Sequence, residues 1–237
     1  MRIRSLLALG AVFLTACSGY GAPSGATEQG RAIAGLWGVF MVAALAVSGI
    51  VSALILWSVI RYRRRGDGRS AQFRDNLPLE IIYTLIPVTI VTALFVWTFR
   101  VENRVAGLPD PGAPGAPVAA IEVTAFNWSW RFDYGNGVVV TGTPDDPPEM
   151  VVPAGQPVRI VLTSEDVVHA FYVPDFLFKR DATPGLVQRF DLLVDREGVY
   201  SGQCAEFCGL DHARMRFTVR AVPPSEFSAW LARESGG

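Results

Sequence analysis

The chain of 237 residues can hold one large domain, or one domain together with membrane segments. Half of its residues are hydrophobic and its formal net charge is −1, but the charge is unevenly divided. Residues 1–100 contain 10 basic and 4 acidic residues, whereas residues 101–237 contain 11 basic and 18 acidic residues. An acidic C-terminal part favours a cationic partner, so no nucleic-acid partner is expected. A glycine-rich phosphate loop and a serine nucleophile elbow are both missing from the sequence.

Residues 1–16 are typical of a secretory signal peptide. Arg2 and Arg4 precede a short apolar run, which ends in Leu-Thr-Ala-Cys at Cys17. This tetrapeptide resembles the lipobox of bacterial lipoproteins, which implies cleavage before Cys17 and lipidation of its sulfur atom. Ordinary signal cleavage, or an uncleaved segment with an inert Cys17, is the alternative. Residues 17–31 are then an external N-terminal segment.

Two uncharged apolar runs predict membrane-spanning helices over residues 32–60 and 81–99. At ~1.5 Å per residue the first helix would be ~44 Å long, which is enough to cross a bilayer with tilt. Helices of this length in the buried core of a soluble domain are the less favoured alternative. The loop between them, residues 61–80, contains six arginines. The positive-inside rule places this loop in the cytoplasm. We therefore expect a multi-pass protein of the bacterial plasma membrane whose N-terminus and C-terminal domain both face the periplasm.

Residues 100–118 are rich in Pro and Gly and predict a linker. Residues 119–224 then alternate between apolar and polar side chains and are rich in β-branched and aromatic types, which predicts short strands. Strand-like runs lie at residues 120–132, 158–164, 189–194, 199–204 and 215–222. This spacing favours a β-sandwich or Greek-key barrel. Residues 225–237 predict a C-terminal helix, capped by Ser225, and a tail.

The segment GQCAEFCGLDHARM, residues 202–215, concentrates side chains that bind metals. A disulfide between Cys204 and Cys208 is one interpretation, because the domain is exported. It would leave His212 and Met215 unexplained, whereas thiolate, imidazole and thioether together are the donors of copper electron-transfer sites. Zinc does not usually recruit Met, and iron–sulfur clusters usually need four thiolates. The other histidine, His169, is expected at a strand edge beside this segment; a packed core histidine is the alternative.

This motif, together with the SEDVVH, KRDATPG and NWSW segments, resembles subunit II of haem–copper cytochrome c oxidases. In that family a transmembrane helical hairpin precedes an all-β, cupredoxin-like Greek-key sandwich. The resemblance implies a dinuclear copper A centre of two copper ions. Its implied ligands are His169 and Met215 on one copper, His212 and the Glu206 carbonyl on the other, and Cys204 and Cys208 bridging both.

The resemblance also implies roles for three other side chains. Trp128 would accept electrons from cytochrome c, although a core aromatic is the alternative. Glu206 would bind a Mg²⁺ ion shared with subunit I, unless it is only a solvated acid. Glu80 would lie near the mouth of a proton-conducting pathway. Four acids that could steer a basic cytochrome c, or be plain surface charges, are Asp133, Glu165, Asp166 and Asp175.

Two positions depart from the family pattern: Ser129 replaces an aromatic residue, and Asp211 stands where Asn is common. The expected function is that of subunit II of a proton-translocating cytochrome c oxidase, with oxidase subunits I and III as partners and O₂ reduced to water at the haems of subunit I. The copper A subunit of a haem–copper nitric oxide reductase is the alternative. A quinol oxidase subunit would lack the copper ligands, and nitrous oxide reductase is larger and soluble. A membrane-tethered copper carrier or a disulfide-stapled domain is less favoured.

Overall fold

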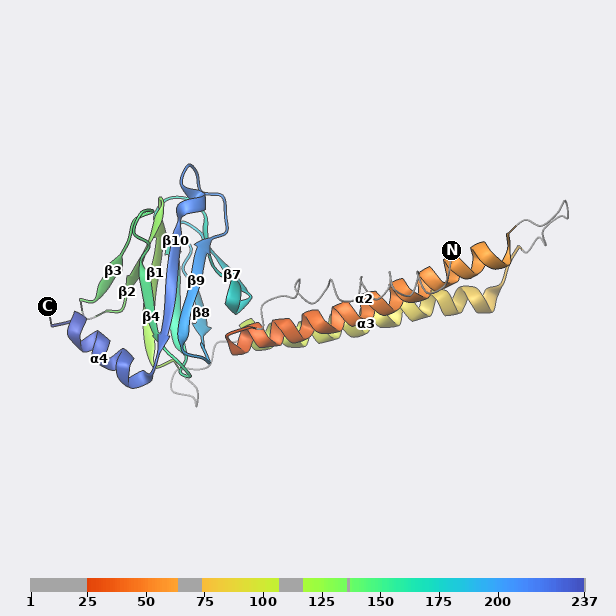
Figure 1. The fold of residues 1–237 in the computed structure, drawn as a ribbon, viewed down its shortest axis with the longest axis horizontal. Helices are drawn as coiled ribbons and strands as arrows, with labels where there is room; N and C mark the ends of the chain where they lie inside the picture. The colour runs from red at the N-terminus through yellow and green to blue at the C-terminus, as the bar shows by residue number, and fades with distance from the viewer. Residues whose placement is uncertain (1–24, 64–73, 107–116, 136, 237) are drawn as a thin grey trace, which may run out of the picture. The chain divides into compact units, whose positions relative to one another are not determined.

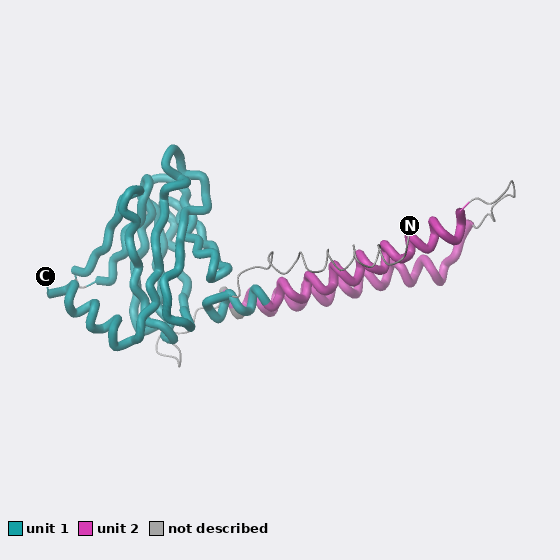
Figure 2. The backbone as a smooth tube through the Cα atoms, in the orientation of Figure 1, with its two compact units in different colours: residues 1–34, 108–237 teal, residues 35–107 magenta. Residues whose placement is uncertain are grey.

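A computed structural model describes residues 25–63, 74–106, 117–135 and 137–236 (Figure 1). The predicted signal peptide, Cys17, residues 64–73 of the basic loop and residues 107–116 of the linker lie outside these residues. The chain forms two compact units (Figure 2): residues 35–107 form one, and residues 1–34 together with 108–237 form the other.

Two long helices carry the apolar runs. Helix α2 (Glu28–Arg61) and helix α3 (Leu77–Ala106) contain segments with mean hydropathies of 2.6 and 2.1. Both extend beyond the runs predicted from the sequence, because polar residues at their ends continue the helix. Most of their large apolar side chains are exposed in the isolated chain, which suits helices that meet lipid.

The unit made of residues 1–34 and 108–237 contains a sandwich of two five-stranded sheets, the β-sandwich domain, ordered β3-β2-β1-β5-β8 and β4-β10-β9-β6-β7. The predicted fold class, a pair of membrane helices followed by an all-β cupredoxin-like sandwich, is confirmed. The strands are β1 (Ala119–Phe126), β2 (Ser129–Asp133), β3 (Val139–Thr141), β4 (Glu149–Pro153), β5 (Val158–Ser164), β6 (His169–Val173), β7 (Phe178–Ala182), β8 (Gln188–Leu192), β9 (Gly198–Cys204) and β10 (Arg216–Val222).

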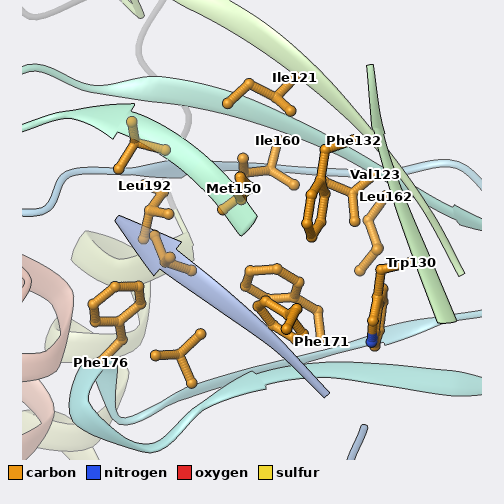
Figure 3. Packing of buried hydrophobic residues seen from close by; sticks show 14 of the residues in the cluster. Ile121, Val123, Trp130, Phe132, Met150, Ile160, Leu162, Phe171, Phe176 and Leu192 are labelled. Carbon is orange, nitrogen blue, oxygen red and sulfur yellow. The ribbon is translucent and has the colours of Figure 1, made fainter. Parts of the chain in front are cut away.

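The two sheets enclose an apolar core in which aromatic rings meet edge to face (Figure 3). Trp130 and Phe171 are fully buried, with ring centroids 6.0 Å apart. Phe217 stacks on Phe171 at 4.6 Å. Each such side chain stabilises the fold by ~1.5–3 kcal/mol through burial. This close-packed core makes a rigid base for the loops at the edge of the sandwich.

Sequence reasoning missed strands β3, β4 and β7, and of β6 it expected only that His169 lies at a strand edge; each of these strands has three to five residues. Strand β7 lies at the edge of its sheet and reads Phe-Lys-Arg-Asp-Ala, so it lacks an apolar pattern. Charged side chains on an edge strand discourage pairing with other chains. In the sequence, such short segments without an apolar pattern are therefore hard to distinguish from loops.

The predicted cap of the C-terminal helix is wrong. Helix α4 (Pro224–Glu234) follows Pro223, and no side chain caps it. Ser225 lies within its first turn, because Pro224 suits the first helical position, where no N–H is needed. The helix is held instead by burying Phe227 and Trp230 near Tyr134.

Candidate metal centre

Strand β9 ends at Cys204, and the loop that follows brings Cys208 beside it. The two Sγ atoms lie 3.8 Å apart, and both residues are buried free thiols. Their separation far exceeds the ~2.05 Å of a disulfide bond. Backbone N–H of Cys204 donates to the carbonyl of Met215 at 2.9 Å, which closes the loop at the point where β10 begins. The sequence segment 202–215 is thus folded into one compact corner.

Two histidines approach this pair of sulfur atoms, one from strand β6 and one from the loop itself. His169 begins β6, which pairs with β9 so that Phe171 faces Cys204. Its Nδ1 lies 3.8 Å from Cys204 Sγ, whereas His212 Nδ1 lies 3.6 Å from Cys208 Sγ. His212 begins a short 3-10 helix, η3 (His212–Arg214), in the loop. Both imidazoles therefore turn the same ring nitrogen toward the sulfurs.

The remaining predicted ligand atoms also lie in this corner. Met215 is fully buried, with its Sδ 3.8 Å from Cys208 Sγ. The Cys204 thiol donates to the backbone carbonyl of Glu206 at 3.2 Å. The ligand atoms of His169, Cys204 and Cys208 all lie within 4.8 Å of one another. One cluster thus gathers two thiols, two imidazoles, a thioether and a carbonyl oxygen; His169, Cys204, Cys208 and Met215 are buried, whereas His212 and Glu206 are half-buried.

The two thiols differ in acidity. Burial raises the pKa of Cys204, but hydrogen bonds with His169 and with nearby backbone groups outweigh this and lower the pKa to about 6. Burial and the negative charge of Cys204 raise the pKa of Cys208 to about 12. A second thiolate in this corner therefore requires positive charge nearby. A soft cation such as copper supplies that charge and matches the donor set, so the residues fit a copper site.

Asp166 orients His169. Its Oδ1 lies 2.8 Å from His169 Nε2, while backbone N–H groups of Val167 and Asn127 donate to its two oxygens at 2.6 Å each. Burial raises the pKa of Asp166, but these hydrogen bonds outweigh it and hold the pKa below its usual value. The carboxylate therefore keeps the proton on Nε2 and leaves the Nδ1 lone pair for a metal. From the sequence Asp166 was expected to steer a basic cytochrome c or to be a plain surface charge; its position three residues before His169 was the available signal for this further role.

Trp128 touches the loop that carries the ligands. Its indole Nε1 donates to the carbonyl of Cys208 at 3.0 Å, and its ring is half-buried. A Cβ on Gly209 would lie 3.2 Å from this ring, so glycine lets the loop approach closely. Trp128 is therefore in direct contact with the cluster rather than part of the core alone.

The Glu206 side chain is held by an ion pair, whereas its backbone carbonyl contacts Cys204. Its carboxylate is paired with the ammonium group of Lys179 on β7, and that ammonium also lies 3.4 Å from Asp181. Sequence reasoning missed this ion pair, because Lys179 lies 27 residues earlier. Magnesium favours carboxylate oxygens, but here a lysine already neutralises this one.

Asp211 fastens the η3 turn. Its backbone carbonyl accepts from Arg214 N–H at 2.9 Å and Met215 N–H at 3.1 Å, and its side chain pairs with Arg214 at 3.2 Å. Arg214 is also paired with Asp145 in the loop before β4. Asp211 thus supports the turn that carries His212 and Met215.

The other predicted site residues lie elsewhere. Glu80 is in the first turn of α3, in the other unit, where its carboxylate accepts from Asn76 N–H at 3.3 Å and helps to cap the helix. Glu165 is paired with Arg131. Asp133 accepts from Gly135 N–H at 2.7 Å, and Asp175 is exposed. Cys17 lies outside the described residues.

Known proteins resemble both parts of the chain. The family described as cytochrome c oxidase subunit II, transmembrane domain, matches residues 16–101, and the periplasmic domain of the same subunit matches residues 144–222. The probable cytochrome c oxidase subunit 2 of Streptomyces avermitilis is 36% identical over 252 residues, covering 89% of this chain and 77% of that protein. The chain belongs to the cytochrome c oxidase subunit II family.

Further relatives show how far the likeness extends. Cytochrome c oxidase subunit 2 of Mycobacterium bovis is 29% identical over all of this chain and 82% of its own length. The solved periplasmic domain of subunit II from Bradyrhizobium japonicum is 31% identical and covers 55% of this chain and 98% of its own, with a TM-score of 0.48. Membership of the subunit II family confirms the predicted family and the predicted enzyme class, a subunit of an oxidoreductase. It also agrees with two membrane-spanning helices.

Proposed function

We propose that the chain accepts electrons from cytochrome c at a dinuclear copper A centre and passes them to the haems of oxidase subunit I, where O₂ is reduced to water. The observation that carries this proposal is the cluster of His169, Cys204, Cys208, His212 and Met215 with the Glu206 carbonyl. Two copper ions bridged by two thiolates would share one electron, so their bond lengths would change little on reduction.

The chain's own residues suit an electron relay. Four of the side chains, those of His169, Cys204, Cys208 and Met215, are buried. His169 begins β6 and Cys204 ends β9, whereas the other donors lie in the loop between β9 and β10, whose ends are held by the pairing of these two strands. Asp166 fixes the proton of His169 at Nε2. With copper bound, these protein donors would hold the metal and would supply an electron relay, with no position expected for a substrate. The assignment of each donor to one copper or the other is part of the proposal.

Electrons would reach the cluster through Trp128. The hydrogen bond from its Nε1 to the Cys208 carbonyl links a half-buried ring directly to a ligand residue. Two large apolar side chains of the same loop are almost fully exposed: Phe207 at 84% and Leu210 at 88%. An exposed apolar patch marks an interaction surface. We assign it to the docked cytochrome c, with acidic side chains of the domain aiding the encounter.

The remaining assignments belong to the same proposal. The domain faces the periplasm of a bacterial plasma membrane, subunits I and III complete the oxidase, and Glu80 lies near the proton pathway. A Mg²⁺ ion shared with subunit I would bind the Glu206 carboxylate only after Lys179 leaves it. Cys17 is the proposed lipidation site.

The experiment is oxygen uptake by the purified complex with reduced cytochrome c as donor. Cys204→Ser removes a bridging thiolate and should abolish both the copper spectrum and oxygen uptake. Oxygen uptake that survives this change would contradict the proposal. Consumption of nitric oxide instead of O₂ by the unchanged complex would favour the nitric oxide reductase alternative.

A further inference from the structure

The segment just before the first membrane helix is bound to the β-sandwich domain. Ala26 N–H donates to the carbonyl of Asp175 at 2.8 Å, and Asp195 N–H donates to the carbonyl of Ala26 at 3.1 Å. Thr27 forms an antiparallel bridge with Val194. Ala26 and Thr27 are buried, with 3% and 1% of their surfaces exposed. Residues far apart in sequence are thus joined by backbone hydrogen bonds, all within one compact unit.

Thr27 joins this contact to the start of α2. Its hydroxyl oxygen accepts from Gly30 N–H at 2.9 Å, which is the usual bond of a helix N-cap. The same hydroxyl lies 3.5 Å from the carbonyl of Phe176 and can donate to it. The residue that starts the membrane helix is therefore also held by the β-sandwich.

Three neighbouring residues of α2 strengthen the contact. Gln29 Nε2 donates to the carbonyl of Asp191 at 3.2 Å, and Arg31 is paired with Asp195. Gly30 is buried, and a Cβ there would come within 2.4 Å of the backbone oxygen of Phe176. Only glycine permits this approach, whereas Gly35 of the same helix has nothing within 4 Å of an added Cβ.

The anchored position is one end of a hairpin that reaches the metal cluster. Asp175 and Phe176 belong to the short 3-10 helix η2 (Pro174–Phe176), which connects β6 to β7. The five residues of β6 span ~17 Å at ~3.3 Å each, and the far end of β6 is His169. A contact that fixes η2 therefore also fixes one end of a strand whose other end carries a donor of the cluster.

We propose that residues 25–31 are a positioning segment that fixes the copper domain on the first turn of the first membrane helix. The chain also joins the domain covalently to α3, through the stretch between Ala106 and Ala119. A second attachment restricts its position over the membrane. Electron transfer falls steeply with distance, so the segment serves transfer from the cluster to the haem-bearing partner. This last step rests on the proposed function.

The test compares Gly30→Leu with the matched control Gly35→Leu in the purified oxidase complex. Gly30→Leu should speed hydrogen exchange in peptides covering residues 25–31 and 192–197. It should leave the copper spectrum and reduction by cytochrome c unchanged, but slow onward transfer to haem by about tenfold or more, as expected when a relay is displaced. Gly35→Leu should change none of these. Unchanged exchange and onward transfer in Gly30→Leu, or equal slowing by Gly35→Leu, would overturn the proposal.

If the Gly30→Leu variant does not assemble into the oxidase complex, exchanging the charges of Arg31 and Asp195 provides a second test. Arg31→Asp alone should speed exchange in the same peptides and slow onward transfer, and the added Asp195→Arg should restore both. A double variant that behaves like the single one would overturn the proposal. Hydrogen exchange measures the contact of residues 25–31 independently of copper. If the proposed copper site were wrong, this would show separately in the spectrum of the unchanged complex.

Discussion

His169 Nε2 lies 2.8 Å from Asp166 Oδ1, and this contact turns the Nδ1 of the imidazole toward Cys204. A carboxylate behind a histidine ligand fixes the ring and its tautomer. Losing such a partner typically weakens metal binding ~10–100-fold. The pair therefore links a residue outside the cluster to the affinity of the cluster.

Asp166→Asn should weaken copper binding by about 10–100-fold, because the amide no longer holds the imidazole proton as strongly. Copper titration of the full chain in detergent, followed by visible absorbance, measures the effect. Glu165→Gln is the matched control: it changes the adjacent acid, which pairs with Arg131 instead, and should bind copper as before. Equal affinities for the Asp166 variant and the unchanged chain would show that Asp166 does not position His169.

Trp128→Gln should slow reduction by cytochrome c at least several-fold while leaving the copper spectrum in place, because it removes the ring that contacts Cys208. Trp128→Phe keeps a ring but loses the N–H donor, so its rate should be intermediate. Stopped-flow reduction of the complex provides the rates. Trp230→Phe, which changes a ring in α4, serves as the control. Wild-type rates in Trp128→Gln would make Trp128 a structural residue only.

Tyr134→Phe should lower the free energy of unfolding of the β-sandwich domain by about 1–3 kcal/mol. The hydroxyl accepts from Val151 N–H at 2.6 Å and donates to the Val151 carbonyl at 3.1 Å, so its loss leaves two backbone groups of β4 without a partner. Denaturant unfolding of the full chain, followed by tryptophan fluorescence, reports the change. The copper spectrum should be unaffected below the transition. A midpoint equal to that of the unchanged chain would contradict this account of Tyr134.

Lys179→Gln should raise the affinity of the complex for a divalent ion at Glu206, since the competing ammonium is gone. Mn²⁺ prefers the same oxygen donors as Mg²⁺ and can be followed by EPR. Arg180→Gln, on the same strand, is a control that should leave the Mn²⁺ affinity unchanged. A lower Mn²⁺ affinity in Lys179→Gln would mean that Lys179 orients Glu206 for the ion instead of competing with it.

The sequence was most informative where the chemistry is local. Cys204, Cys208, His212 and Met215 lie within one turn-rich segment, so their spacing alone indicated a metal site. The apolar runs of the membrane helices were equally plain. His169 was found because the chain has only two histidines.

Contacts between distant residues could not be predicted in this way. The pairing of Lys179 with Glu206 and the contact of Thr27 with Phe176 join segments 27 and 149 residues apart. The first depends on β6 pairing with both β7 and β9 in one sheet, and the second on the N-terminal segment packing against η2. Asp166 was seen as an acid but not as the partner of His169, because its role depends on the turn that brings Asn127 and Val167 to its oxygens.

The most direct test of the copper site is EPR spectroscopy of the copper-loaded full chain in detergent. Two equivalent coppers that share one electron through Cys204 and Cys208 should give a seven-line hyperfine pattern and a purple colour. Cys208→Ser should abolish both. A four-line pattern from a single copper, or tight binding of zinc without any redox response, would contradict the dinuclear centre.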